Sequence, residues 1–265
     1  MINLIHAEFY KLYKSISIKL CFLIAGISAA AFTVISHALA AGSISKNVIG
    51  SASGLSELVI IALLGSLLSG ILVCNDFETK TIHDAVACGK GRRSIVISKM
   101  LIYICIMLVL LMPYGVSSIV GFCTGAQFVK PFVGSAFLRM LYDGNNYSLT
   151  TGNICKMVSV SLTLVLVHAA RLSICIPVAF KTRKPVAVTA IGFAYSILID
   201  LILGLLKDTP VLGKLISISP YNREFILMSF DTKAEVMGKA VISSTVFLVL
   251  MTILTYYSFR RAEIK

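Results

Sequence analysis

The chain has 265 residues, of which 57% are hydrophobic and only 14% are charged, and its mean hydropathy is +0.92. Soluble domains contain about 45–50% apolar and about 25% charged residues, so this composition excludes a disordered chain, a collagen and an ordinary soluble enzyme. The net charge is +12, from 24 Lys and Arg against 12 Asp and Glu. Membrane proteins place such basic residues in cytoplasmic loops beside anionic lipid, and no basic stretch here is interleaved with aromatic residues. We therefore expect the lipid bilayer as a partner, and no nucleic acid.

Six hydrophobic runs approach or exceed the length of about 20 residues that a membrane-spanning helix needs. They cover residues 18–41, 58–74, 95–122, 154–180, 186–206 and 240–259. The predicted fold is therefore an all-α integral membrane protein with six transmembrane helices in a single domain, residues 1–265. An even number of spans places both termini on the same side of the membrane.

The distribution of basic residues predicts which side that is. The hairpin between the fourth and fifth runs is short and contains Lys181, Arg183 and Lys184. The N-terminal stretch, the loop 76–99 and the C-terminal tail are also basic, whereas the connections on the other side are longer. Short loops follow the positive-inside rule best, so we expect both termini in the cytoplasm.

The first 16 residues have the pattern of an amphipathic helix that lies flat in the membrane interface. One face carries the apolar residues Ile2, Ile5, Phe9, Leu12, Tyr13 and Ile16. The opposite face carries Glu8, Lys11, Lys14 and Ser15. Such a helix serves either as a membrane anchor or as an elbow that transmits motion into the first span.

The predicted cytoplasmic loop 76–94, between the second and third runs, is longer than a plain connection requires. Asn75 is expected to cap a short helix, with Glu78 three residues later completing a capping box. One face of that helix would carry Ile82, Ala85, Val86 and Gly89. The loop is therefore either a solvated connection or a docking helix for a cytoplasmic partner.

Three features together carry a resemblance to a known family. They are the amphipathic N-terminal helix, the N-D-F-E-T-K-T…G-K-G-R-R-S…S-K-M stretch from Asn75 to Met100, and Ser219-Pro220-Tyr221 before the last span. In these features the chain resembles the permease subunit of ABC transporters of the exporter-like type 2 family, which includes small six-span permeases that protect against lantibiotics and related peptides. The resemblance implies a set of residues that couple to the ATPase: Asp76, Phe77, Glu78, Ile82, Val86, Arg92 and Arg93.

The same resemblance implies a function. A permease of this kind moves an amphipathic substrate, such as an antimicrobial peptide, across the bacterial plasma membrane. It pairs with a second copy or a sister permease and with a separate ATP-binding cassette subunit. The sequence contains no G-x-x-x-x-G-K-[ST] motif, so ATP is expected to bind the partner, and this chain is expected to be neither an enzyme nor a cofactor carrier.

Charged and titratable residues inside the runs are costly in a bilayer and are candidates for a substrate path, here His168, Arg171 and Asp200. Counted from the ends of their spans at about 1.5 Å per residue, Arg171 and Asp200 differ in depth by roughly 10 Å. A direct pair between them is therefore not expected. The alternative function, an ion- or proton-coupled secondary transporter, would use these two charges as its relay.

Two further features leave alternatives open. The segment 207–239 contains apolar stretches too short to span, which predict re-entrant or interfacial helices forming either a packed outer cap or a gate for the substrate. Cys123 and Cys155 flank the same predicted outer loop, so a disulfide between them is geometrically possible. The seven cysteines show no CxxC pair and no zinc-ligand spacing, so no metal site is predicted.

Overall fold

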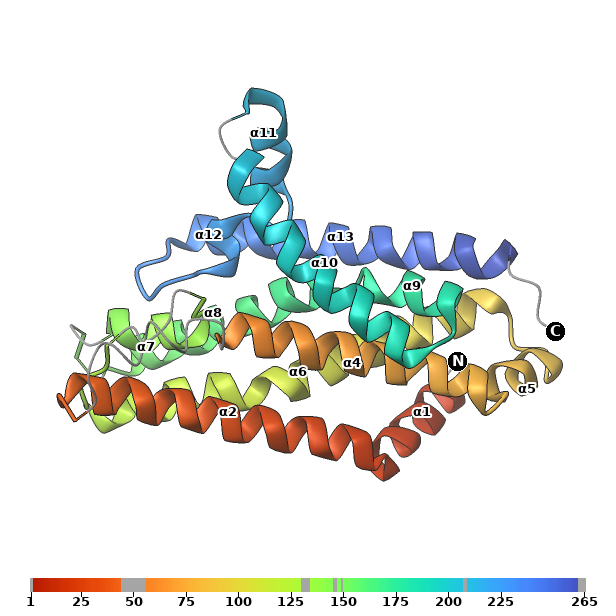
Figure 1. The fold of residues 1–265 in the computed structure, drawn as a ribbon, viewed down its shortest axis with the longest axis horizontal. Coiled ribbons are helices and arrows are strands. Elements are labelled where there is room, and N and C mark those ends of the chain that lie inside the picture. The colour runs from red at the N-terminus through yellow and green to blue at the C-terminus, as the bar shows by residue number, and fades with distance from the viewer. Residues whose placement is uncertain are drawn as a thin grey trace.

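The computed structural model describes residues 2–43, 56–129, 134–144, 147–148, 150–206 and 209–261, which form a bundle of helices (Figure 1). No strand occurs among these residues. Within them, six helices are long and apolar enough to cross a membrane, which confirms the six predicted spans and indicates a multi-pass membrane protein. The spans are α2 (Ile16–Ala40), α4 (Glu57–Glu78), α6 (Arg92–Thr124), α8 with α9 (Thr151–Leu172 and Cys175–Thr182), α10 (Pro185–Leu206) and α13 (Ala234–Arg261).

Among the described residues, five shorter helices lie at the ends of the bundle or beside it. They are α1 (Ile2–Lys14), α5 (Thr81–Ala87), α7 (Phe137–Gly144), α11 (Pro210–Ile218) and α12 (Arg223–Ile226). Helix α1, helix α5 and the last turns of α13 lie at one end, here called the α5 end, and α7 lies at the other, here called the α7 end (Figure 1). Residues 207 and 208 of the predicted gate segment and the tail residues 262–265 lie outside the described part of the chain.

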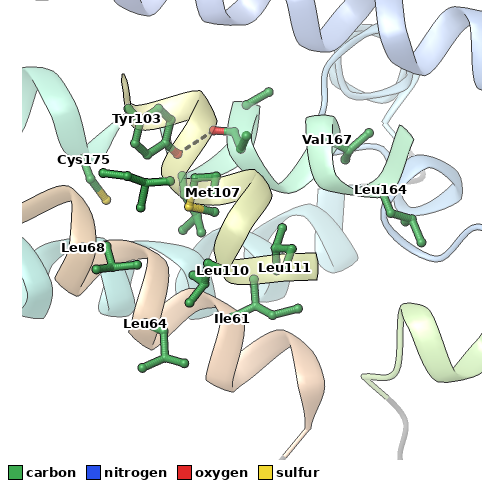
Figure 2. Packing of buried hydrophobic residues seen from close by; sticks show 14 of the residues in the cluster. Ile61, Leu64, Leu68, Tyr103, Met107, Leu110, Leu111, Leu164, Val167 and Cys175 are labelled. Atoms are coloured by element: carbon green, nitrogen blue, oxygen red, sulfur yellow. Dashed lines mark hydrogen bonds between the residues drawn. The ribbon is translucent and has the colours of Figure 1, made fainter. Parts of the chain in front are cut away.

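The core lies between α4, α6 and α8, and Figure 2 shows its apolar side chains interdigitating. Leu64 and Leu68 of α4 and Met107 and Leu110 of α6 belong to this core. The hydroxyl of Tyr103 donates a hydrogen bond of 2.7 Å to the carbonyl oxygen of Ala169, which satisfies a polar atom inside the core. By contrast, α2, α10 and α13 expose most of their apolar residues, as expected of helices that face lipid.

Small residues allow α10 to lie directly against α4 and α9. A Cβ added to Gly192 would lie 2.5 Å from the sulfur of Cys175 and 2.7 Å from the Cβ of Ser66. A Cβ added to Gly70 would lie 3.0 Å from the carbonyl oxygen of Pro185. Close backbone approach at small residues is a usual mode of helix packing in membranes. From this contact α10 crosses the bundle obliquely and carries α11 away from it (Figure 1).

The structure corrects two predicted boundaries. Helix α4 continues through Glu78, so Asn75 lies inside a helix and the predicted capping box is wrong. Lys80 adopts a left-handed conformation with φ of 57°, and α5 begins only at Thr81. The fourth span is interrupted at residues 173–174 between α8 and α9.

Candidate functional site

A cluster of four charges joins α1, α4 and α6 at the α5 end; we call Glu8, Lys11, Asp76 and Lys99 the Lys99 cluster. Three of them are buried, and Lys11 lies at its exposed edge. The side chain of Lys99 is 2% exposed, and its ammonium group donates to Glu8 Oε2 at 2.6 Å, to the Leu72 carbonyl oxygen at 3.1 Å and to Asp76 Oδ2. Lys11 donates to the other oxygen of Asp76 at 3.2 Å. All three hydrogens of the Lys99 ammonium therefore have acceptors, as a buried cation requires.

The Lys99 cluster overturns the prediction for the faces of α1. Glu8, expected on the polar outer face, is 5% exposed, whereas Phe9 is 45% and Tyr13 is 74% exposed. The reason is that α1 packs on a charge rather than on a purely apolar surface, so its carboxylate turns inward. One signal was present in the sequence, because Lys99 lies inside the predicted span 95–122, where a charge needs a partner.

The apolar face of helix α5 packs against the helix bundle of the same chain. Ile82 is buried, and Ala85 and Val86 are partly buried against the core. The opposite face carries Lys80, Asp84 and Cys88, which are exposed. Because Ile82 and Val86 face inward, the surface of this helix that is open to a partner is the exposed face 80–84–88.

Phe77, one of the predicted coupling residues, also lies inside the bundle. Its ring packs edge-on against Phe180 of α9 at 5.7 Å and Phe259 of α13 at 6.4 Å between centroids. The guanidinium of Arg183 lies 4.9 Å above the same ring. Phe77 therefore joins α4, α9 and α13, and Asp76 beside it points into the Lys99 cluster.

Arg92 and Arg93 bind the end of α13. Arg92 donates to the carbonyl oxygens of Phe259 and Arg260 at 3.1 and 2.7 Å, which satisfies acceptors that the last turn of a helix leaves open. Arg93 donates to the hydroxyl of Tyr256 at 3.2 Å. The structure thus gathers the predicted coupling residues at one end of the bundle, and among them Glu78 is exposed at the end of α4.

A second charged site lies between α8 and α10. Arg171 Nη2 donates to Asp200 Oδ1 at 2.5 Å, so the expectation that these residues lie at different depths is wrong. Counting residues along straight helices failed because α8 ends just after Arg171 and α10 runs obliquely. The ring of Tyr221 lies 5.6 Å from the guanidinium, and its hydroxyl donates to the Arg171 carbonyl oxygen at 3.0 Å. Burial raises the pKa of Tyr221 above its usual value, so this hydroxyl stays protonated.

His168 lies one turn before Arg171 on α8 and is buried. Its ring packs against Phe137 with centroids 6.3 Å apart. Within the described residues, His168 Nε2 and Arg171 Nε are buried without a hydrogen-bond partner. Arg171 and Asp200 therefore form an ion pair with His168 one turn away on α8, a polar patch in an apolar bundle.

At the α7 end, sequence reasoning missed Glu57. Its buried carboxylate accepts the backbone N–H groups of Ala136, Phe137 and Leu138 at 2.7, 3.0 and 3.3 Å, which caps the start of α7 and ties it to α4. Tyr147 donates to Asp231 across the same end. That hydrogen bond raises the pKa of Tyr147.

The two cysteines whose pairing was left open, Cys123 and Cys155, are free and exposed in this structure. Comparison of the chain with models of known protein families and with characterised proteins finds no match. The resemblance to type 2 permeases therefore rests on the residues quoted from the sequence.

Proposed function

We propose that the chain is the membrane-spanning permease subunit of an ATP-driven ABC exporter of type 2, in a bacterial plasma membrane, with both termini and the α5 end in the cytoplasm. The observation that carries this proposal is the Lys99 cluster beside the exposed face of α5. A soluble partner could bind the exposed polar face of α5. The charge network behind α5 joins three helices, so movement of α5 would be transmitted to the spanning helices.

A series of hydrogen bonds and ion pairs connects α5 on the surface to the spanning helices. Lys11 donates to the hydroxyl of Thr81, the first residue of α5, at 3.4 Å, and also binds Asp76. Asp76 and Glu8 share Lys99. Breaking a buried ion pair by removing one partner costs about 3–5 kcal/mol, so α1, α4 and α6 are expected to move together when α5 is pushed.

The remaining parts of the proposal follow from the exposed apolar helices and the second charged site. Helices α2, α10 and α13 present large apolar faces that lipid or a second permease, identical or a sister chain, would cover. The patch of His168, Arg171 and Asp200 would line the path of an amphipathic substrate such as an antimicrobial peptide, and the segment 207–239 would gate it. ATP would bind the partner subunit.

Crosslinking from Cys88 tests the contact surface. A photoreactive group attached to Cys88 in inside-out native membranes should capture an ATP-binding protein, identified by mass spectrometry. A version that keeps only Cys123, an exposed cysteine in the last turns of α6, should capture none. Equal capture from Cys123, or capture from Cys88 of lipid alone, would contradict the assignment of α5 as the docking helix.

The direct contact between Arg171 and Asp200 favours a second candidate, an ion- or proton-coupled secondary transporter that uses this pair as a charge relay. The two functions differ in their energy source. In vesicles containing the chain alone, proton uptake that depends on Asp200 without ATP would support the second candidate, whereas a dependence on ATP hydrolysis by a second protein would support the first.

A further inference from the structure

A groove of about 530 Å³ lies inside the elbow that α1 and α2 form, against α4 and α6. Figure 1 shows this elbow, where the chain turns between α1 and α2 at Ser15. The groove is apolar, and its walls include Phe9, Tyr13, Phe22, Leu68 and Val109. Among its lining residues Lys19 is the one that carries a charge.

We propose that this groove binds one acyl chain of an anionic phospholipid, with the headgroup phosphate at Lys19. The proposal requires only that the spanning helices lie in a bilayer, and it does not depend on an ATPase partner. The lipid would come from the leaflet at the α5 end, because Lys19 is in the first turn of α2 at that end. Basic pockets between spanning helices are known to bind anionic headgroups.

The depth of the lining residues fits this arrangement. Leu68 lies in the middle of α4 and Val109 in the middle of α6, so the deep wall of the groove is at the level of the hydrocarbon. A cavity this apolar offers water no hydrogen-bond partners and does not hold it well. An alkyl chain fits the deep part, and a charged headgroup fits only at the mouth.

The charge of Lys19 is available for such a headgroup. Its ammonium lies 5.3 Å from the ring of Tyr13, a side chain at the mouth of the groove. No carboxylate pairs with Lys19 among the described residues, in contrast to Lys11, which binds Asp76 and Glu8. Phe9 and Tyr13 are also exposed on the groove rather than packed in the core, which leaves aromatic surface for the chain to cover.

The absence of tryptophan from the sequence provides a clean reporter. In a Phe22→Trp variant, the introduced residue is the only tryptophan and lies in the groove wall. It would be reconstituted into phosphatidylcholine vesicles containing a small fraction of lipid with brominated chains, either phosphatidylglycerol or phosphatidylcholine. We expect the brominated anionic lipid to quench about fivefold more effectively at equal mole fraction, the preference that one basic residue beside anionic lipid supplies.

Adding Lys19→Gln should abolish this preference, whereas Lys14→Gln should keep it. The Lys14→Gln variant loses the same charge nearby, but the Lys14 ammonium lies over Tyr10 and does not line the groove.

A Leu250→Trp reporter on the exposed face of α13 should show no preference between headgroups. If Phe22→Trp does not assemble, Val109→Trp reports from the opposite wall. Equal quenching by both lipids, or a preference that survives Lys19→Gln or is lost equally in Lys14→Gln, would overturn the proposal.

Discussion

The ammonium group of Lys99 lies 2.6 Å from the carboxylate of Glu8, a contact between residues 91 positions apart in the chain. It fastens the short helix α1 to the long helix α6 by a buried charge. Asp76 of α4 shares the same ammonium. Three helices therefore meet at one nitrogen atom, next to the helix proposed to receive a partner.

Removing that nitrogen should destabilise the bundle. Lys99→Met leaves Glu8 and Asp76 buried without their cation, which costs about 3–5 kcal/mol, and thermal unfolding followed by far-UV circular dichroism in detergent should begin several degrees lower. Lys11→Met should change little, because the Lys11 side chain is 42% exposed and exposed pairs contribute about 0–1 kcal/mol.

A triple variant, Glu8→Leu with Asp76→Leu and Lys99→Met, separates charge from packing. Replacing a whole buried ionic group by apolar residues is often neutral, so this variant should regain most of the stability that Lys99→Met loses. Unfolding of Lys99→Met at the wild-type temperature would show that the cluster does not hold α1 in place.

Phe77→Ala should lower the free energy of unfolding even when no partner is bound. The ring lies between Phe180 and Phe259, and truncating a buried phenylalanine costs about 3–5 kcal/mol. Lys80→Ala, three residues later on the exposed face, should unfold like the wild type. If the Phe77→Ala protein keeps wild-type stability yet no longer binds the ATPase, Phe77 contacts the ATPase directly.

The Arg171–Asp200 contact predicts non-additive effects. Asp200→Asn should cost on the order of 1 kcal/mol more in the wild type than in an Arg171→Gln background, because residues in direct contact couple. Thermal unfolding of the two single variants and the double variant measures this difference. Strictly additive losses would mean that the two side chains do not interact in the folded protein.

The proposed orientation predicts which thiols a membrane-impermeant reagent reaches. In single-cysteine versions on intact cells, Cys123 and Cys155 should be labelled and Cys88 should not, although all three are exposed in the structure. Labelling of Cys88 should appear once the membrane is permeabilised. Modification of Cys88 from outside intact cells would invert the topology.

Hydropathy alone was sufficient to predict the six spans, because a bilayer demands about 20 apolar residues and little else. It could not predict the pairing of distant charges. Glu8 was assigned to the solvent face since helical periodicity ignores a buried cation such as Lys99. Arg171 and Asp200 were separated since a residue count assumes straight helices, whereas α8 ends beside Arg171 and α10 is oblique.

The segment 76–94 shows the same limit. Its apolar face was correctly recognised from the spacing of Ile82, Ala85 and Val86, but spacing does not say what covers such a face. In the structure the bundle itself covers it, so the surface left for a partner is the polar one, with Lys80, Asp84 and Cys88.

We propose that a separate ATPase docks on that polar face. The direct measurement is ATP hydrolysis by the tagged chain purified from its native membranes in mild detergent, comparing wild type with Asp84→Lys. The control is Glu235→Lys, which reverses an exposed charge in the first turn of α13, at the end of that helix far from α5. We expect hydrolysis with wild type and Glu235→Lys and about a tenfold loss with Asp84→Lys, since reversing a charge at an interface costs well over 1 kcal/mol. Full activity in Asp84→Lys, or none in the wild type, would show that no ATPase docks on this face.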